Sequence, residues 1–249
     1  MSISLTIPTP CAYTSTKSDR TFFFTMGIVF ALITLVGFAP TYYLRPLSNQ
    51  PPLSLLVHVH AMAMTVWMAL FIVQTALVRA DRRDLHKFLG LIAVGVFILI
   101  AWAGVMTAIE SAAAGKGNIG GRQLTPEARL YRVFVGNLLH FVGYAIAGFC
   151  FRRRAATHKR LMLLAAGAAV GPALSRIHQL FELAPIFHLL PLIGFMAVYW
   201  SYDLVKYRRI HPAYILAVVV SLATRPHPIN RMIMESETWH HIARWLISN

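Results

Sequence analysis

Seven apolar segments follow one another along this chain, with short polar connections between most of them. The first six come near the roughly 20 apolar residues that a helix needs to cross a bilayer. Only 13% of the residues are charged and 57% are hydrophobic, so polar side chains are too few to cover a water-soluble domain. We therefore expect an all-α fold, an integral membrane helical bundle of about seven transmembrane helices. The segments are residues 22–44, 53–78, 89–109, 130–151, 161–180, 186–205 and 214–224.

The sequence predicts three regions. Residues 1–20 form a polar tail without the basic region and apolar core of a cleavable signal, so the first apolar segment is expected to stay as an anchor. Residues 21–225 hold the bundle, in which the short last segment is either a seventh span or a re-entrant or interfacial helix. Residues 226–249 form an amphipathic tail with Trp239, Ile242 and Trp245 at three-residue spacing. That spacing predicts an interfacial C-terminal helix.

Charge predicts the orientation and the environment. Fourteen of the 23 Lys and Arg residues fall on the side of the membrane that carries the N-terminus, mostly in short connections. Because short cytoplasmic loops are enriched in basic residues, we expect a cytoplasmic N-terminus and a place in the bacterial inner membrane. The net charge of +14 then indicates contact with the anionic lipid of the bilayer, not with nucleic acid.

Two stretches of the chain resemble each other. Counted from His86 and from His158, five of eight positions are identical, and each stretch follows an apolar segment that bears another histidine. This internal similarity predicts a duplicated helical hairpin over residues 53–109 and 130–180. The alternative is that any basic connection entering an apolar helix has this pattern.

Four histidines fall within or at the ends of the apolar segments, where a polar group needs a partner. His60 and His140 lie at similar depths in the outer half, whereas His86 and His158 lie at the cytoplasmic edge. Histidine pairs on different helices, one pair in each leaflet, are what a bundle needs to bind two b-type hemes. The alternative for His86 and His158 is that they only mark the water interface.

Other polar residues in the apolar part allow further interpretations. His60, Met64 and Met68 share one helix face, which would suit copper(I) or would simply be packing. An outer cluster is either a metal or quinone site or a set of polar groups that neutralise one another, with Glu182 offsetting Arg176. Asp203 and Lys206 are predicted to form an interfacial salt bridge. The members proposed as metal ligands are His58, His178, Glu182 and His188.

Motif searches exclude several classes of enzyme. The sequence has no nucleophile elbow, phosphate loop, Cys-x-x-Cys or His-Glu-x-x-His, so hydrolases and nucleotide-dependent enzymes have no support. Whether the protein is an enzyme stays open, and a membrane oxidoreductase is the class that the histidines would allow.

Two motifs carry a resemblance. Leu85-His86-Lys87-Phe88-Leu89-Gly90 and His158-Lys159-Arg160-Leu161-Met162, with Arg176 further on, resemble a large group of uncharacterised bacterial multi-span membrane proteins over residues 55–246. The placement of the four histidines is similar to that in diheme, ascorbate-reducible b-type cytochromes. That resemblance implies two heme pairs, His60 with His140 and His86 with His158. A weaker similarity is to four-histidine membrane factors that help to assemble heme-copper oxidases.

Three functional hypotheses follow. The first is a heme b electron carrier that passes electrons across the membrane or to quinone. The second is a non-enzymatic assembly or metal-handling factor for a respiratory complex, and the third is a structural membrane protein without a cofactor. We prefer the first, which predicts that His60 and His140 are ligands.

Overall fold

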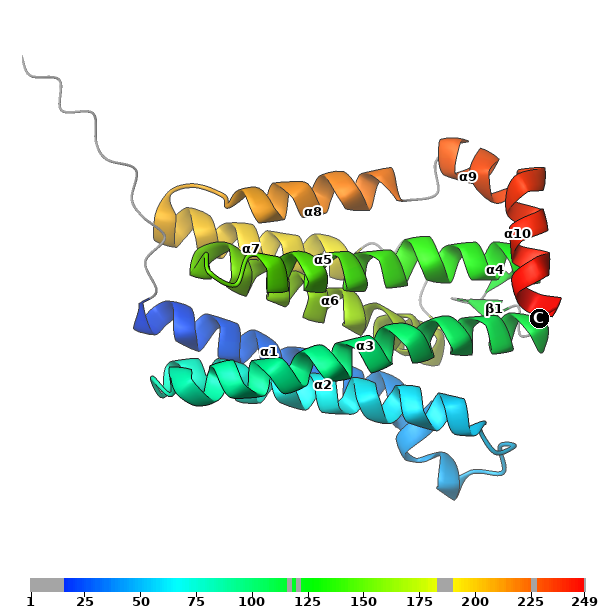
Figure 1. The fold of residues 1–249 in the computed structure, drawn as a ribbon, viewed down its shortest axis with the longest axis horizontal. Coiled ribbons are helices and arrows are strands. Elements are labelled where there is room, and N and C mark those ends of the chain that lie inside the picture. The colour runs from blue at the N-terminus through cyan, green and yellow to red at the C-terminus, as the bar shows by residue number, and fades with distance from the viewer. Residues whose placement is uncertain (1–15, 116–117, 120–121, 183–189, 225–227, 249) are drawn as a thin grey trace, which may run out of the picture.

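The computed structural model describes residues 16–115, 118–119, 122–182, 190–224 and 228–248. The chain forms an up-and-down helical bundle (Figure 1). Its elements are α1 (Lys17–Phe38), η1 (Ala39–Tyr43), η2 (Arg45–Leu47), α2 (Leu55–Arg79), α3 (Arg83–Ala113), β1 (Asn118–Ile119), β2 (Arg122–Gln123), α4 (Pro126–Val133), η3 (Phe134–Leu138), α5 (Leu139–Cys150), α6 (Ala155–Leu180), α7 (Leu190–Tyr207), α8 (Pro212–Ala223), α9 (Pro228–Met234) and α10 (Glu237–Ser248).

Five helical segments are long and apolar enough to cross a membrane, which confirms the helical, membrane-type character of the bundle. They are Lys17–Tyr43, Leu55–Arg79, Arg83–Ala113, Pro126–Cys150 and Ala155–Leu180. The last two expected spans correspond to α7 and to the short apolar helix α8. We name the end of the bundle where α1, α3, α6 and α8 begin the N-terminal end, and the other end the distal end (Figure 1).

The third and fourth helices begin earlier than their apolar segments predict. α3 begins at Arg83 and α4 at Pro126, because a first turn can be charged when its free backbone groups are capped or reach water. Thr125 caps α4 by accepting a hydrogen bond from the Ala128 amide at 3.2 Å. The stretch of residues 111–129, between the apolar segments 89–109 and 130–151, is therefore partly helical. It contains the end of α3, the start of α4, and the antiparallel pair β1–β2.

α6 lies at the centre of the bundle and packs through small side chains. The buried residues in its middle are Leu163, Leu164, Ala165, Ala166, Ala169, Val170 and Ala173. α1 approaches it so closely that a Cβ atom built on Gly37 would lie 2.5 Å from the carbonyl oxygen of Ala173. Small residues at helix contacts allow this close approach. Because lipid tails are as apolar as the side chains, helices in a membrane associate through such close packing and not through the hydrophobic effect.

Large apolar side chains cover the outward faces. Leu91 and Ile98 of α3 are 74% and 60% exposed, and Val219 of α8 is 57% exposed. In water such a surface would be unfavourable, whereas in a bilayer it contacts acyl chains. The exposed apolar side chains and the lengths of the helices thus both support a membrane environment.

At the distal end, α10 packs across the ends of α3 and α4 (Figure 1). Ala243 is fully buried against Ala108, Ala112 and Leu130. The indole nitrogen of Trp239 donates to the Glu127 carbonyl oxygen at 3.0 Å. The expected helix is present, but Trp239 faces the bundle, and only Ile242 and Trp245 of the predicted stripe are exposed.

We predict that Gly37→Ala destabilises the protein by about 1–3 kcal/mol, because the added methyl group overlaps the α6 backbone. Equilibrium unfolding in mixed micelles measures the change. Gly95→Ala is the matched control, since nothing lies within 4 Å of a Cβ atom there. Equal stabilities of the two variants would contradict the close α1–α6 contact.

Candidate functional site

His86 and His158 face each other at the N-terminal end of the bundle. Each is the fourth residue of its helix, α3 and α6 respectively. Their ring centroids are 6.3 Å apart and the ring planes are inclined at 84°. The structure thus brings together one of the two pairs expected from the sequence. The two similar stretches of sequence place His86 and His158 at the same position in α3 and α6.

The orientation of His158 is fixed by the backbone of α5. Its Nδ1 atom lies 2.7 Å from the carbonyl oxygen of Gly148. Because a carbonyl oxygen only accepts, Nδ1 carries the proton and Nε2 of the neutral ring is an acceptor. Metal-ligating histidines usually have this arrangement, in which the second nitrogen donates to a backbone carbonyl or a carboxylate.

The spacing of the two rings is one at which both could hold a metal ion between them. Two imidazoles that each bind a central metal ion at about 2 Å have ring centres about 6 Å apart. The observed 6.3 Å agrees with that spacing. Perpendicular ring planes are compatible with it, since each ring rotates about its own metal–nitrogen axis.

His60 and His140 contact different elements. The ring of His60 lies against α3 where Gly104 has no side chain, with its Cε1 atom 3.3 Å from the position of a Cβ atom there. Nε2 of His140 lies 3.0 Å from the Thr224 hydroxyl at the end of α8, and its ring packs against Tyr144. Of this second expected pair, His60 thus contacts α3 and His140 contacts the end of α8.

Three of the four residues expected to form an outer metal cluster lie in the described part of the chain. His58 lies 3.4 Å from the Tyr42 hydroxyl, His178 is buried in α6, and Glu182 is exposed beyond the end of α6. His188 lies outside the described residues. Among the residues that the structure describes, no group of three or more His, Cys, Asp or Glu side chains is placed to hold a metal ion. Of the residues named for the copper alternative, Met68 lies in the apolar core and Met64 packs against it.

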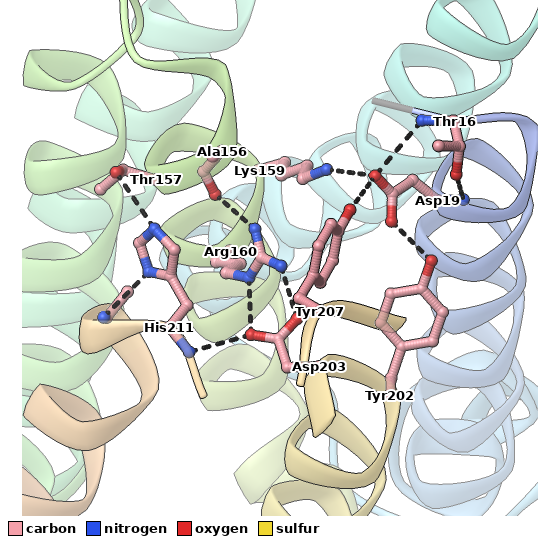
Figure 2. Close-up of polar contacts among 11 residues, drawn as sticks. Thr16, Asp19, Ala156, Thr157, Lys159, Arg160, Tyr202, Asp203, Tyr207 and His211 are labelled. Carbon is pink, nitrogen blue, oxygen red and sulfur yellow. Dashed lines mark hydrogen bonds and ion pairs between the residues drawn. The ribbon is translucent and has the colours of Figure 1, made fainter. Parts of the chain in front are cut away.

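The expected salt bridge between Asp203 and Lys206 is wrong. Asp203 and Arg160 are both fully buried and form a two-point ion pair, with Arg160 Nε donating to Asp203 Oδ2 at 3.1 Å and Nη2 to Oδ1 (Figure 2). The His211 amide also donates to Asp203 at 3.0 Å. A buried carboxylate needs several donors, and a single exposed lysine one turn away supplies too few.

A second buried carboxylate, Asp19, lies beside this pair. Lys159 Nζ donates to Asp19 at 2.7 Å, and the hydroxyls of Tyr202 and Tyr207 donate to it as well (Figure 2). Asp19 also completes a capping box with Thr16 at the start of α1. Sequence reasoning missed this cluster, although the Thr16-x-x-Asp19 spacing was a visible signal for a helix start.

Three consecutive residues of α6 therefore contact three other helices. His158 faces His86 of α3, Lys159 binds Asp19 of α1, and Arg160 binds Asp203 of α7. The ion pairs neutralise both cations next to the histidine pair. The start of α6 fixes the position of the candidate ligand and the packing of the bundle together.

His211 lies in the connection between α7 and α8 and is held as a neutral ring. Its Nδ1 atom accepts a hydrogen bond from the Ala213 amide at 3.1 Å, which caps α8. Burial and the nearby Arg160 charge lower the pKa of His211 to about 4.

Comparisons with family models, with curated proteins and with solved structures find no match for this chain. The resemblances drawn from the two histidine motifs therefore stay predictions, and the geometry of the site carries the functional argument.

We predict that Asp203→Ala destabilises the protein by about 3–5 kcal/mol, because it leaves the Arg160 charge buried without its carboxylate. Adding Arg160→Met should recover much of the loss, since no charge is then buried. Unfolding in mixed micelles measures both changes. The control Asp84→Asn, in an exposed ion pair, should leave stability unchanged. A loss no larger than that of the control would contradict the buried pair.

The His211 pKa predicts a pH dependence. Because the folded protein holds His211 neutral down to about pH 4 while the unfolded chain takes up a proton near about pH 6.5, its contribution to stability is complete above about 6.5 and falls as the pH drops toward 4. Melting temperatures between these values measure it. His211→Asn keeps a capping side chain, does not titrate, and should show a flatter profile. The same profile for both proteins would refute the assignment, with exposed His241→Asn as control.

Proposed function

We propose that this chain is a heme b protein that carries electrons in the membrane, with His86 and His158 as the two axial ligands of one heme. The observation that supports the proposal is the ring spacing of 6.3 Å, together with the bond that leaves His158 Nε2 available. A heme held by these two histidines would supply one-electron transfer.

The residues around the pair have supporting roles. The Gly148 carbonyl holds His158 in one orientation and raises the basicity of its other nitrogen. Lys87 follows His86 on α3 and is exposed, so it is available to pair with a carboxylate at the membrane surface, such as a heme propionate. Asp19 and Asp203 keep the charges of Lys159 and Arg160 from opposing a cationic iron centre.

The proposed environment is the bacterial inner membrane, crossed seven times, with the N-terminus in the cytoplasm and α10 at the membrane surface. Five apolar helices and the basic residues at the N-terminal end support this topology. In that orientation a heme held by His86 and His158 would lie near the cytoplasmic face. His60 and His140 would then serve a second heme in the outer half, and quinone or a respiratory complex is the class of partner that would exchange electrons with the protein.

Optical spectra of the protein purified in detergent, oxidised and then reduced with dithionite, test the function. We expect a Soret band that shifts on reduction and sharp α and β bands. His86→Ala and His158→Ala should each abolish the heme signal of this pair, while exposed His241→Ala should leave it unchanged. His140→Ala should halve the heme content only if the outer pair also binds heme.

Colourless, iron-free protein from cells supplied with heme would overturn the proposal. Copper or zinc in that sample would favour the metal-handling alternative, and a sample without metal would favour a structural role. Heme content that survives both His86→Ala and His158→Ala would refute the ligand assignment even if the protein is red. Gel filtration of each variant shows whether a lost signal reflects loss of the fold.

A further inference from the structure

A group of exposed cations lies at the N-terminal end of the bundle. The connections between α5 and α6 and between α7 and α8 are both at this end (Figure 1). They are neighbours, because the Thr157 hydroxyl at the start of α6 lies 3.4 Å from Nε2 of His211. We name the exposed cations in and beside these two connections the basic face. Its members are Arg152, Arg153, Arg154, Lys206, Arg208 and Arg209.

Acidic residues are segregated from the basic face. Neither of its two connections contains one, whereas in the α2–α3 connection Asp81 and Asp84 pair with neighbouring arginines. The positive-inside rule explains cations in short loops, but acidic residues have little influence on orientation, so the rule does not require their absence. The segregation therefore leaves a positive field that membrane insertion does not need. The glutamates of the chain all lie at the distal end (Figure 1): Glu110, Glu127, Glu182, Glu235 and Glu237.

Arg208 occupies a backbone position that favours glycine. Its φ is 57°, in the left-handed region, and its amide closes the end of α7 by donating to the Leu204 carbonyl oxygen at 3.0 Å. An L side chain is crowded in this region, whereas glycine is not. The Arg208 side chain is exposed and forms no ion pair with any residue that the structure describes. The fold thus accepts backbone strain for a charge that it does not use itself.

The basic face lies next to a candidate heme ligand. Arg154 precedes His158 by four residues, which is about one helical turn, or about 6 Å along α6. Because the connections close the end of the bundle, they face water along the bundle axis, whereas lipid surrounds the sides of the bundle (Figure 1). A soluble partner seated on the basic face would therefore come close to the His158 ring.

We propose that the basic face docks an acidic, soluble electron-transfer protein, an inference that rests on the function proposed above. Opposite charges attract such a partner over several ångströms and orient its acidic surface toward the connections. An interface made mainly of exposed charges is short-lived, which suits a carrier that must leave after each exchange. Salt screens these charges, so we expect binding to weaken as the ionic strength rises.

Binding of flavodoxin, a small acidic electron-transfer protein, to the full chain in nanodiscs of phosphatidylcholine tests the proposal. We expect Arg153→Gln combined with Lys206→Gln to weaken binding about tenfold at low salt, because both charges face the partner. Arg231→Gln combined with Arg244→Gln is the matched control, since it removes two exposed cations from the distal end. Binding of flavodoxin to this control should not change.

Arg208→Gly gives a second readout that a purely structural role would not produce. We expect flavodoxin binding to weaken about threefold, while the melting temperature rises by about 2 °C because glycine relieves the left-handed backbone. Affinity and stability would then move in opposite directions, so a loss of binding could not be ascribed to damage to the fold.

Equal affinities of the two double variants, or an absence of flavodoxin binding at low salt, would overturn the proposal. Binding that disappears when phosphatidylglycerol is added to the nanodiscs would overturn it too, because anionic lipid would then cover the basic face. Heme content of the same samples separates the two proposals. A heme protein that does not bind flavodoxin refutes the docking surface alone, whereas a heme-free protein that binds it refutes the proposed function and the electron-transfer role of the partner.

Discussion

Neutralisation of buried charge is the constraint on which the rest of this structure depends. Arg160 and Asp203 lie fully buried in a bundle whose outer surface is apolar, so neither charge is stable there without the other. Their pairing holds α7 against the start of α6, and Asp19 with Lys159 does the same for α1. The positions of four helix ends follow from these two carboxylates.

The same residues position the candidate ligand. His158 directly precedes Lys159 and Arg160, so the two ion pairs restrict the rotation of α6 and thereby the direction of the His158 ring. The hydrogen bond from His158 Nδ1 to the Gly148 carbonyl oxygen then fixes the rotation of the imidazole ring. Preorganisation of this kind lowers the cost of binding a cofactor, because ligands held in place lose little entropy when it binds.

The sequence predicts the helices well because hydrophobicity and length alone decide which segments suit a bilayer. It also predicts His86 and His158 as a pair, since their shared local pattern puts them at equal positions in two helices. It does not predict the partner of Asp203, which lies 43 residues away along the chain. Such pairings depend on how each helix is rotated about its axis, and spacing along the chain carries no information about that rotation.

The contacts of Asp19 have a consequence for the order of assembly. Its tyrosine partners lie 183 and 188 residues later in the chain, on the sixth long helix. Before α7 is in place, the Asp19 carboxylate therefore lacks both hydroxyl donors, and Lys159 of α6 is the side chain left to neutralise it. The hydroxyl groups of Tyr202 and Tyr207 become available only when α7 has joined the bundle. The position of α1 is then fixed by a helix from near the end of the chain.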